Sequence, residues 1–332
     1  MPFAWRLAPA IALLTLGLAC VRGTPTASAP APVRPGASDA SDGRAQSDAA
    51  TTLRVVAAGD IACDGCGQSA TAGLIEQLIA ADHVTAVLAL GDLAYSSGSA
   101  AEFRSFYAPT WGRPDILGIS HPVPGNHEYA SGSAGDYFDY FNGAGAASGP
   151  AGPRGQGYYS FDVGAWHVIG LNSSDECRYV SCASTSPQYQ WLVADLAAHP
   201  VGCTIAFWHH PRYQAGTTSG ELDAAAPLWN ALYDAGVDVV LNGHEHGYQQ
   251  LSGLDKDGHL DLARGIRTFV VGTGGGDYDV TFGGPRAGAL ETSIAGTHGV
   301  LELTLRSASY EWQFIAVDGS RPSKASGSAL CH

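Results

Sequence analysis

The feature that most constrains this chain is a recurring pattern: a short apolar run typical of a buried strand ends in a glycine, and side chains able to bind metal ions follow at once. The four segments with this pattern are Gly59-Asp60, Gly91-Asp92-Leu93-Ala94-Tyr95, Gly125-Asn126-His127-Glu128 and Gly243-His244-Glu245-His246. A fifth strand-like run ends directly in His209-His210-Pro211. Glycine lets the backbone turn sharply, and ligands of open α/β sheets bind outside the carboxyl ends of the strands. We therefore expect the five loops to meet at one crevice.

The runs between these loops predict the fold class. Buried strands are expected where short apolar runs occur, at residues 53–58, 84–90, 204–208 and 237–241. Helices with one apolar face are expected at residues 71–79, 189–197 and 225–233. Alternating strands and helices predict an α/β core with parallel strands and right-handed crossovers. Three further runs, at residues 268–271, 299–305 and 310–317, follow one another without helices, which predicts an antiparallel or mixed sheet.

The N-terminal region is interpreted as a targeting segment followed by a tether. Arg6 precedes an apolar run that is too short for a membrane span of roughly 20 residues, which predicts a signal peptide over residues 1–23. The run ends in Leu16-Gly17-Leu18-Ala19-Cys20, which resembles a bacterial lipobox whose cysteine is lipidated; cleavage near Ala19 without lipidation is the alternative. Residues 24–52 have hardly any large apolar side chains, which predicts a disordered linker. Residues 53–332 are expected to form a single domain.

The cysteines predict disulfide bonds. Apart from Cys20, the chain has Cys63, Cys66, Cys177, Cys182, Cys203 and Cys331. An even number in an exported chain favours disulfides over free thiols. Short loops pair the first with the second and the third with the fourth, which leaves the last two to join a central strand to the C-terminus. A zinc site at Cys63 and Cys66 is the alternative, but the sequence lacks a second pair at zinc-ribbon spacing.

Composition restricts the function. The formal net charge of −14 argues against a groove for nucleic-acid backbones, which needs clustered Lys and Arg. A site that handles phosphate in such a chain would need metal ions. Carboxylate, imidazole, amide and phenolate donors suit metals of intermediate to hard character, and two ions about 3.5–4 Å apart can stabilise both the attacking and the leaving oxygen of an in-line displacement.

The five blocks resemble those of the purple acid phosphatases, which carry GDxG, GDxxY, GNH followed by Glu or Asp, a His before a Pro, and GHxH in this order. The resemblance covers about residues 53–317. Ala62 stands where the family commonly has Gly, and it is not the His of the Asp-x-His block found in many other members of the wider superfamily. The resemblance implies the calcineurin-like metallophosphoesterase fold, an α/β fold of two packed mixed β-sheets flanked by helices (an α/β/β/α sandwich), with residues 53–332 as the catalytic domain.

The resemblance also implies a ligand set for two metal ions. The first ion would be bound by Asp60, Asp92, Tyr95 and His246, and the second by Asp92, Asn126, His209 and His244, with Asp92 as the bridge. A Tyr95 phenolate is a hard anionic donor, which favours Fe(III) at the first site. Fe(II), Zn(II) and Mn(II) all fit the second.

The implied function is that of an exported phosphatase, secreted or held at the cell surface as a lipoprotein by Cys20. It would hydrolyse small-molecule phosphomonoesters by in-line attack of a metal-bound hydroxide. His127 is the expected catalytic acid, because it adjoins the ligand Asn126 without being assigned to a metal, and Glu128 would orient His127 or another ligand. His210 would face the substrate or merely flank the ligand His209. The alternatives are a phosphodiesterase or nucleotidase using the same site, or a surface binding module that retains metals without turnover.

Overall fold

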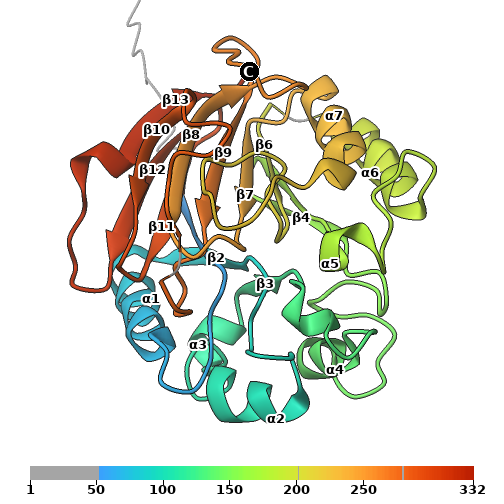
Figure 1. Ribbon diagram of the computed structural model, residues 1–332, viewed down its shortest axis with the longest axis vertical. Coiled ribbons are helices and arrows are strands. Elements are labelled where there is room, and N and C mark those ends of the chain that lie inside the picture. The colour runs from blue at the N-terminus through green and yellow to red at the C-terminus, as the bar shows by residue number, and fades with distance from the viewer. Residues whose placement is uncertain (1–51, 201, 279) are drawn as a thin grey trace, which may run out of the picture. The chain divides into compact units, whose positions relative to one another are not determined.

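Two β-sheets form the centre of the structure, a computed structural model that describes residues 52–200, 202–278 and 280–332 (Figure 1). The predicted signal peptide, Cys20 and residues 24–51 of the predicted linker lie outside the described residues.

The first sheet has the strand order β13-β12-β11-β1-β2-β3. Its strands are β1 (Leu53–Ala58), β2 (Val84–Ala89), β3 (Ser120–Pro122), β11 (Gly299–Leu305), β12 (Ser309–Ala316) and β13 (Ser326–Leu330). β1, β2 and β3 pair in parallel, whereas β11 pairs antiparallel with β1, and β12 and β13 continue antiparallel. The carboxyl ends of the first three strands therefore lie at one edge.

The second sheet has the order β10-β8-β9-β7-β6-β5-β4. Its strands are β4 (Tyr159–Val163), β5 (Trp166–Gly170), β6 (Thr204–Phe207), β7 (Val239–Asn242), β8 (Tyr248–Leu254), β9 (Ile266–Val271) and β10 (Leu290–Ile294). The neighbours β5, β6, β7 and β9 pair in parallel, and the outer strands pair antiparallel. Both sheets are thus mixed, as predicted.

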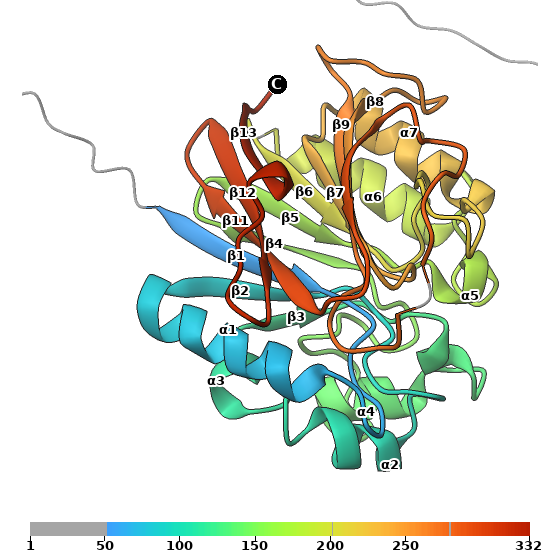
Figure 2. The ribbon, with the colours of Figure 1, turned by 60° about the vertical axis from the view of Figure 1, so that its left-hand side comes forward.

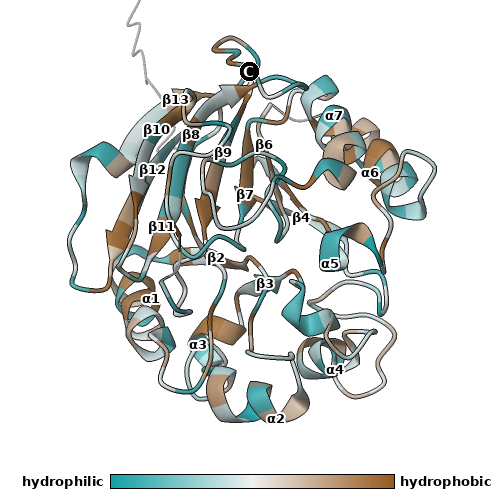
Figure 3. Ribbon diagram, in the orientation of Figure 1, coloured by the Kyte–Doolittle hydropathy of each residue, from teal (hydrophilic) through white to brown (hydrophobic). Residues whose placement is uncertain are grey.

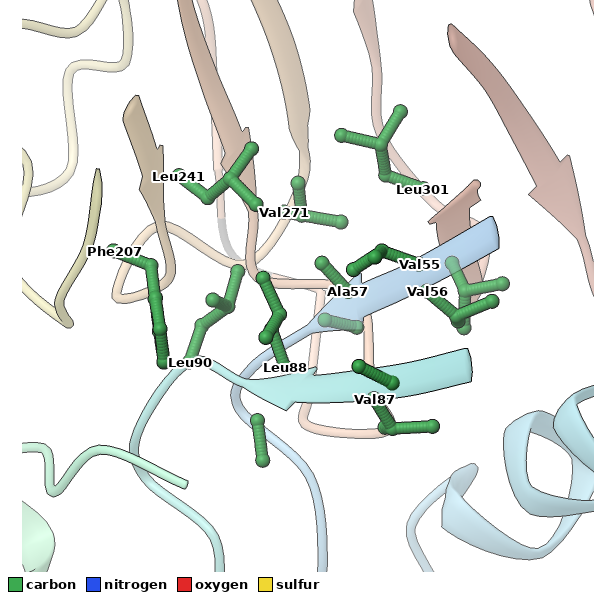
Figure 4. Close-up of a cluster of buried hydrophobic side chains, with 14 of the residues drawn as sticks. Val55, Val56, Ala57, Val87, Leu88, Leu90, Phe207, Leu241, Val271 and Leu301 are labelled. Carbon is green, nitrogen blue, oxygen red and sulfur yellow. The ribbon is translucent and has the colours of Figure 1, made fainter. Parts of the chain in front are cut away.

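The core lies between the two sheets. Side chains of β1, β2 and β11 face those of β6, β7 and β9 in one buried cluster (Figure 4). Val55, Leu88, Phe207, Leu241 and Val271 are fully buried in it. Burying a large aliphatic or aromatic side chain stabilises a fold by roughly 1.5–3 kcal/mol, so the nearly uninterrupted apolar composition of these strands explains why the sheets pack face to face. Figure 3 shows the same hydrophobic colouring along β7 and β9.

Helices cover the outer faces of both sheets (Figure 2). The longer ones are α1 (Gln68–Asp82), α4 (Gly135–Asn142), α6 (Pro187–Ala198) and α7 (Ala226–Asp234), with short turns α2 (Ala100–Glu102), α3 (Pro114–Leu117) and α5 (Ser174–Cys177). Figures 1 and 2 show α1 to α4 beside the first sheet and α6 and α7 beside the second. The predicted α/β/β/α sandwich is therefore confirmed.

The three tail runs do not share one sheet. The run at residues 268–271 is part of β9 in the second sheet, whereas β11 and β12 belong to the first. The expectation of an antiparallel or mixed sheet holds for β11 and β12. It also holds for β9, which pairs in parallel with β7 and antiparallel with β8 in the mixed second sheet.

The six cysteines of the described residues form the predicted disulfides. The bonds are Cys63–Cys66, Cys177–Cys182 and Cys203–Cys331. The last ties the chain just before β6 to the segment after β13, 128 residues later. Within the described part of the chain, no helix is long and apolar enough to span a membrane.

A buried histidine joins the second sheet to α6 and predicts a pH dependence of stability. In His167 on β5, Nδ1 lies 2.9 Å from the Asp162 carboxylate and Nε2 lies 2.8 Å from that of Asp195. Burial lowers the pKa of His167, but its hydrogen bonds to Asp195 and Asp162 raise it, and the net pKa is raised. The same contact lowers the pKa of Asp195 against its burial. The stacked ring of His199 lies 4.1 Å away.

Because the folded pKa of His167 is raised, its contribution to stability is complete below the unfolded value of about 6.5 and is lost as pH rises through the folded value. We expect the melting temperature to fall between pH 6 and 9, and to fall less in His167→Gln. The exposed His259 provides the matched control, His259→Gln, which should behave as wild type. Equal declines in all three proteins would contradict this assignment.

Candidate metal centre

The five loops meet where the parallel strands end. Asp60 follows β1, Asp92 follows β2, Asn126 follows β3, His209 follows β6, and His244 and His246 follow β7. Backbone hydrogen bonds join the loops: Asp60 N–H donates to Gly91 O at 2.9 Å, and Gly243 N–H donates to His209 O at 3.0 Å. The loops therefore form one rim across the ends of both sheets.

Local backbone geometry explains the glycines of the blocks. Asp60, Asp92 and His244 have positive φ angles of 61°, 50° and 74°, a conformation that is costly for residues with a side chain. The glycines leave space for these side chains, since a Cβ at Gly125 would overlap the Asp92 carboxylate and one at Gly243 would crowd that of Asp60. The pattern in the sequence thus reflects close packing as well as turning.

His209 is the centre of one group of donor atoms. Its Nδ1–H donates to Leu90 O at 2.9 Å, which leaves the lone pair on Nε2. Nε2 faces Asn126 Oδ1 at 3.1 Å, Asp92 Oδ2 at 3.3 Å and His244 Nδ1 at 3.3 Å. Most of these atoms are acceptors, and the side chain of His209 is fully buried. A cation among them would satisfy lone pairs that protons alone cannot share.

A second group of donor atoms adjoins the first. His246 Nδ1–H donates to Asp277 O at 2.7 Å, so Nε2 turns its lone pair to Asp60 Oδ1 at 3.4 Å and Tyr95 Oη at 3.1 Å. Tyr95 Oη lies 3.1 Å from Asp60 Oδ1. One ligand atom each of Asp60, Asp92 and His209 lies within 4.8 Å of the others, which brings the two groups close enough for a pair of ions. The donor set therefore fits two metal ions.

The charges of the centre depend on one another. Burial raises the pKa of Asp92, but the charge of His209 and its hydrogen bond hold it below its usual range. Burial lowers the pKa of His209, and Asp92 raises it to about 9. Burial and the charge of His209 lower the pKa of His244 to about 4. Burial and Asp60 raise the pKa of Tyr95. A bound cation would replace the proton that these anionic groups attract.

Glu128 holds the loops after β2 and β3 together and does not orient the side chain of His127. Its carboxylate accepts four backbone N–H groups, from Gly125 at 2.7 Å, Leu93 at 2.8 Å, Asp92 at 3.0 Å and Ala94 at 3.3 Å. The side chain is buried, and burial with the charge of Asp92 raises its pKa to about 7. Of the two roles expected for Glu128, orientation of His127 is not what these bonds provide. They join the loop after β2 to the loop after β3.

His127 lies at the mouth of the centre. Its Nδ1–H donates to Ser96 O at 2.6 Å, and Nε2 lies 3.7 Å from Asp92 Oδ2. The side chain is 33% exposed, and its ring packs edge-on against Tyr95. Nε2 is thus the ring atom that would face a molecule bound at the centre.

His210 lies beside the group of donors around His209 and is almost fully buried. Its Nδ1 lies 2.8 Å from Ser173 Oγ, which also accepts the His210 backbone N–H at 3.1 Å. Its ring lies 4.4 Å from that of His244 and 4.8 Å from that of His209. One ligand atom from each of these three histidines lies within 4.8 Å of the others.

All nine predicted site residues come together in the structure, and their individual roles remain predictions. Sequence reasoning missed the groups that orient them, namely Leu90 O, Ser173 Oγ and Asp277 O. Backbone carbonyls leave no sequence signal. The glycine run at residues 272–276 also packs on the first block: Gly274 N–H donates to Gly59 O and Gly276 N–H to Asp60 O, both at 2.8 Å.

Comparisons with known proteins were made on the sequence and on the structure. The calcineurin-like phosphoesterase family model matches residues 53–248. Purple acid phosphatase 15 of Arabidopsis thaliana is 34% identical over 124 residues, which cover 36% of this chain and 22% of that protein. An uncharacterized protein of Mycobacterium tuberculosis is 27% identical over 184 residues, covering 46% of this chain and 35% of that protein. The chain therefore matches only a part of the length of these curated relatives.

Solved structures share the fold. Purple acid phosphatase PPD1 from yellow lupin (Lupinus luteus) seeds superposes with a TM-score of 0.66 at 19% identity, over 85% of this chain and 54% of that chain. GAP50, described as the anchor in the inner membrane complex of Plasmodium, superposes with a TM-score of 0.64 at 16% identity, over 85% of this chain and 89% of that chain. At these identities the likeness concerns the fold.

Proposed function

We propose, on the premise that this chain belongs to the calcineurin-like phosphoesterase family, that it is an exported phosphatase of purple acid phosphatase type with two metal ions at the centre described above. The observation that carries the proposal is the cluster of lone pairs around His209 Nε2, where Asp92, Asn126 and His244 converge. This donor set suits a metal ion, and the adjoining group around Asp60 provides for a second.

The residues that would hold each ion follow from the two donor groups. The first ion would be held by Asp60, Asp92, Tyr95 and His246, and the second by Asp92, Asn126, His209 and His244. When bound, the two ions would supply an activated water and positive charge for the phosphoryl oxygens. The protein's part is to fix the donors, through Leu90 O on His209 and Asp277 O on His246.

Tyr95 carries the proposal that the first ion is Fe(III). A phenolate bound to Fe(III) absorbs visible light, so we expect the purified protein to be coloured and Tyr95→Phe to lose the band. Fe(II), Zn(II) and Mn(II) remain candidates for the second ion. A colourless, active protein loaded with Zn(II) or Mn(II) would contradict the iron proposal and leave the dinuclear hydrolase standing.

His127 is proposed to donate a proton from Nε2 to the leaving oxygen. General acid catalysis contributes about 10²–10⁴-fold, and it matters most when the leaving group is a poor one. We expect His127→Ala to lower kcat about 100-fold on glycerol 2-phosphate and less than about tenfold on p-nitrophenyl phosphate. Comparing the two substrates provides the test. Equal losses on both would contradict the acid role.

Phosphomonoesters are the proposed substrates, and a phosphodiesterase or nucleotidase using the same centre is the second candidate. Purified protein lacking residues 1–23 and loaded with metal should hydrolyse p-nitrophenyl phosphate between pH 4 and 9 faster than bis(p-nitrophenyl) phosphate. The reverse order favours the diesterase. Absence of turnover on either ester in a metal-loaded sample would favour a binding module that retains metals.

Export is supported by three disulfides in the described residues, since such bonds persist in oxidising compartments. We further propose that residues 53–332 form the single catalytic domain and that Cys20 carries a lipid. Mass spectrometry of the N-terminal peptide from the membrane fraction tests the lipid. A soluble protein cleaved near Ala19 would contradict it.

A further inference from the structure

A cavity of about 280 Å³ opens beside the metal centre. His210 and His244 are among its lining residues, and so are three acidic residues, Glu176, Glu221 and Asp223. A phosphate ester bound at the centre would have this cavity next to its phosphoryl group. The walls of the cavity therefore bear on which alcohol the ester carries.

The side chain of His210 opens into this cavity. It is 4% exposed, and its Nδ1 is engaged by Ser173. Its Nε2 has no hydrogen-bond partner among the residues that the structure describes, although Nε2 is a strong polar group. A nearly buried ring nitrogen without a partner, on a residue that lines a cavity, points to a bound molecule that supplies the missing partner.

Glu176 reaches the cavity from an unusual turn. Residues 174–177 all have positive φ angles, with Glu176 at 59°, and the Cys177–Cys182 disulfide closes the turn. Such a left-handed run of side-chain-bearing residues is costly and persists where the surroundings hold it. Glu176 is exposed, and in the described chain no hydrogen bond or ion pair engages its carboxylate. Its charge is therefore available to a molecule in the cavity.

The other two carboxylates stand on a loop that is already fixed. Glu221 accepts hydrogen bonds from Arg286 Nε at 2.8 Å and Nη2 at 3.0 Å, and Asp223 accepts one from Arg212 Nη1 at 2.8 Å. Each of these two carboxylates is thus paired with an arginine, and the Asp223 side chain is 92% exposed.

Glu245, between the two histidines of the last block, anchors the same loop. Its carboxylate accepts the Ser219 N–H at 2.7 Å and a hydrogen bond from Gln214 Nε2 at 3.2 Å. Glu245 therefore holds the loop that carries Glu221 and Asp223 close to His244.

We propose that this cavity receives the alcohol part of the substrate and selects alcohols that carry an ammonium group. This inference rests on the proposed phosphomonoesterase function and deepens it. An ammonium group in the cavity gains Coulomb energy from Glu176, whose carboxylate has no cation beside it among the described residues, whereas an alcohol with further phosphate groups is repelled by it. In the reaction, water's oxygen bonds to phosphorus, the P–O ester bond breaks, and a proton passes to the alcohol oxygen, giving phosphate and the amino alcohol.

The test compares two monoesters of nearly equal shape. Phosphocholine carries a quaternary ammonium group, and 3,3-dimethylbutyl phosphate carries a carbon atom in its place. We expect kcat/KM for phosphocholine to exceed that for the neutral ester roughly fivefold, as for partly exposed charges. The ratio should shrink in about 0.5 M NaCl because salt screens exposed charges. A ratio of one or below at low salt would overturn the inference.

Variants locate the effect in the cavity. Glu176→Gln keeps the shape of the side chain and removes its charge, so the ratio should fall about twofold or more. Glu311→Gln removes a carboxylate on β12 that is paired with Arg306, and it should leave the ratio unchanged. Equal effects of the two variants would mean that net charge alone matters, and would overturn the role of the cavity.

Binding separates this inference from the proposed function. If p-nitrophenyl phosphate is not hydrolysed, the phosphatase proposal fails by itself. Calorimetry of the metal-loaded protein with phosphocholine and with 3,3-dimethylbutyl phosphate then decides the inference. Tighter binding of phosphocholine, reduced in Glu176→Gln, supports it, and equal or weaker binding overturns it.

Discussion

Replacing Asp92 by Asn is expected to lower kcat on p-nitrophenyl phosphate by at least about a thousandfold, the scale of losses for groups essential to a catalytic centre. The Asp92 carboxylate lies between His209 Nε2 at 3.3 Å and the His127 N–H at 2.9 Å. An amide of the same size keeps one oxygen but loses the negative charge that would bridge two cations. The bound metal should fall from two ions per chain to one or none.

The matched control is Glu311→Gln, an exposed carboxylate-to-amide change that should retain activity and both ions. Circular dichroism and a count of free thiols would establish that Asp92→Asn keeps the fold and its disulfides. An undiminished rate in a folded Asp92→Asn protein would contradict the bridging role.

Replacing Glu128 by Ala is expected to lower the free energy of unfolding by about 3–5 kcal/mol. Four buried N–H groups lose their acceptor, and each buried unsatisfied group costs about 1–3 kcal/mol. The total is smaller than the sum of four separate costs, because the contributions of neighbouring groups are not fully additive. Guanidinium unfolding of the wild type and the variant measures the change. Glu128→Gln, which keeps one acceptor oxygen, should lose less.

Glu102 offers a matched control, because its carboxylate also accepts backbone N–H groups but is accessible to water. Its carboxylate accepts the backbone N–H groups of Ser96, Ser97 and Ser99, but water can replace it because it is not buried. Glu102→Ala should therefore cost about 1 kcal/mol, as for the loss of a helix cap. Equal losses at Glu102 and Glu128 would contradict the burial argument.

The site was predictable because its signals are local. A ligand loop needs a glycine where side chains crowd the backbone, as at Gly125 and Gly243, and it follows an apolar strand whose end fixes its position. Both features are written in consecutive residues. The predicted strands at 53–58 and 299–305 coincide with β1 and β11, and the others differ by one or two residues at their ends.

What could not be predicted depends on contacts between distant segments. β8 carries buried polar side chains, including Gln249 and Gln250, so it lacks an apolar signature. Gln249 accepts the Ala215 N–H through Oε1 at 2.6 Å, a partner 34 residues away. The left-handed turn at Glu176 likewise has no pattern, since its conformation is set by the fold around it.

The central claim is that two metal ions at this centre carry out the hydrolysis. It is tested most directly by removing metal with a chelator, adding it back in small steps, and following turnover of p-nitrophenyl phosphate. The account predicts no turnover without metal and a plateau at two ions per chain. Full activity in the metal-free protein, or a plateau at one ion per chain, would contradict it.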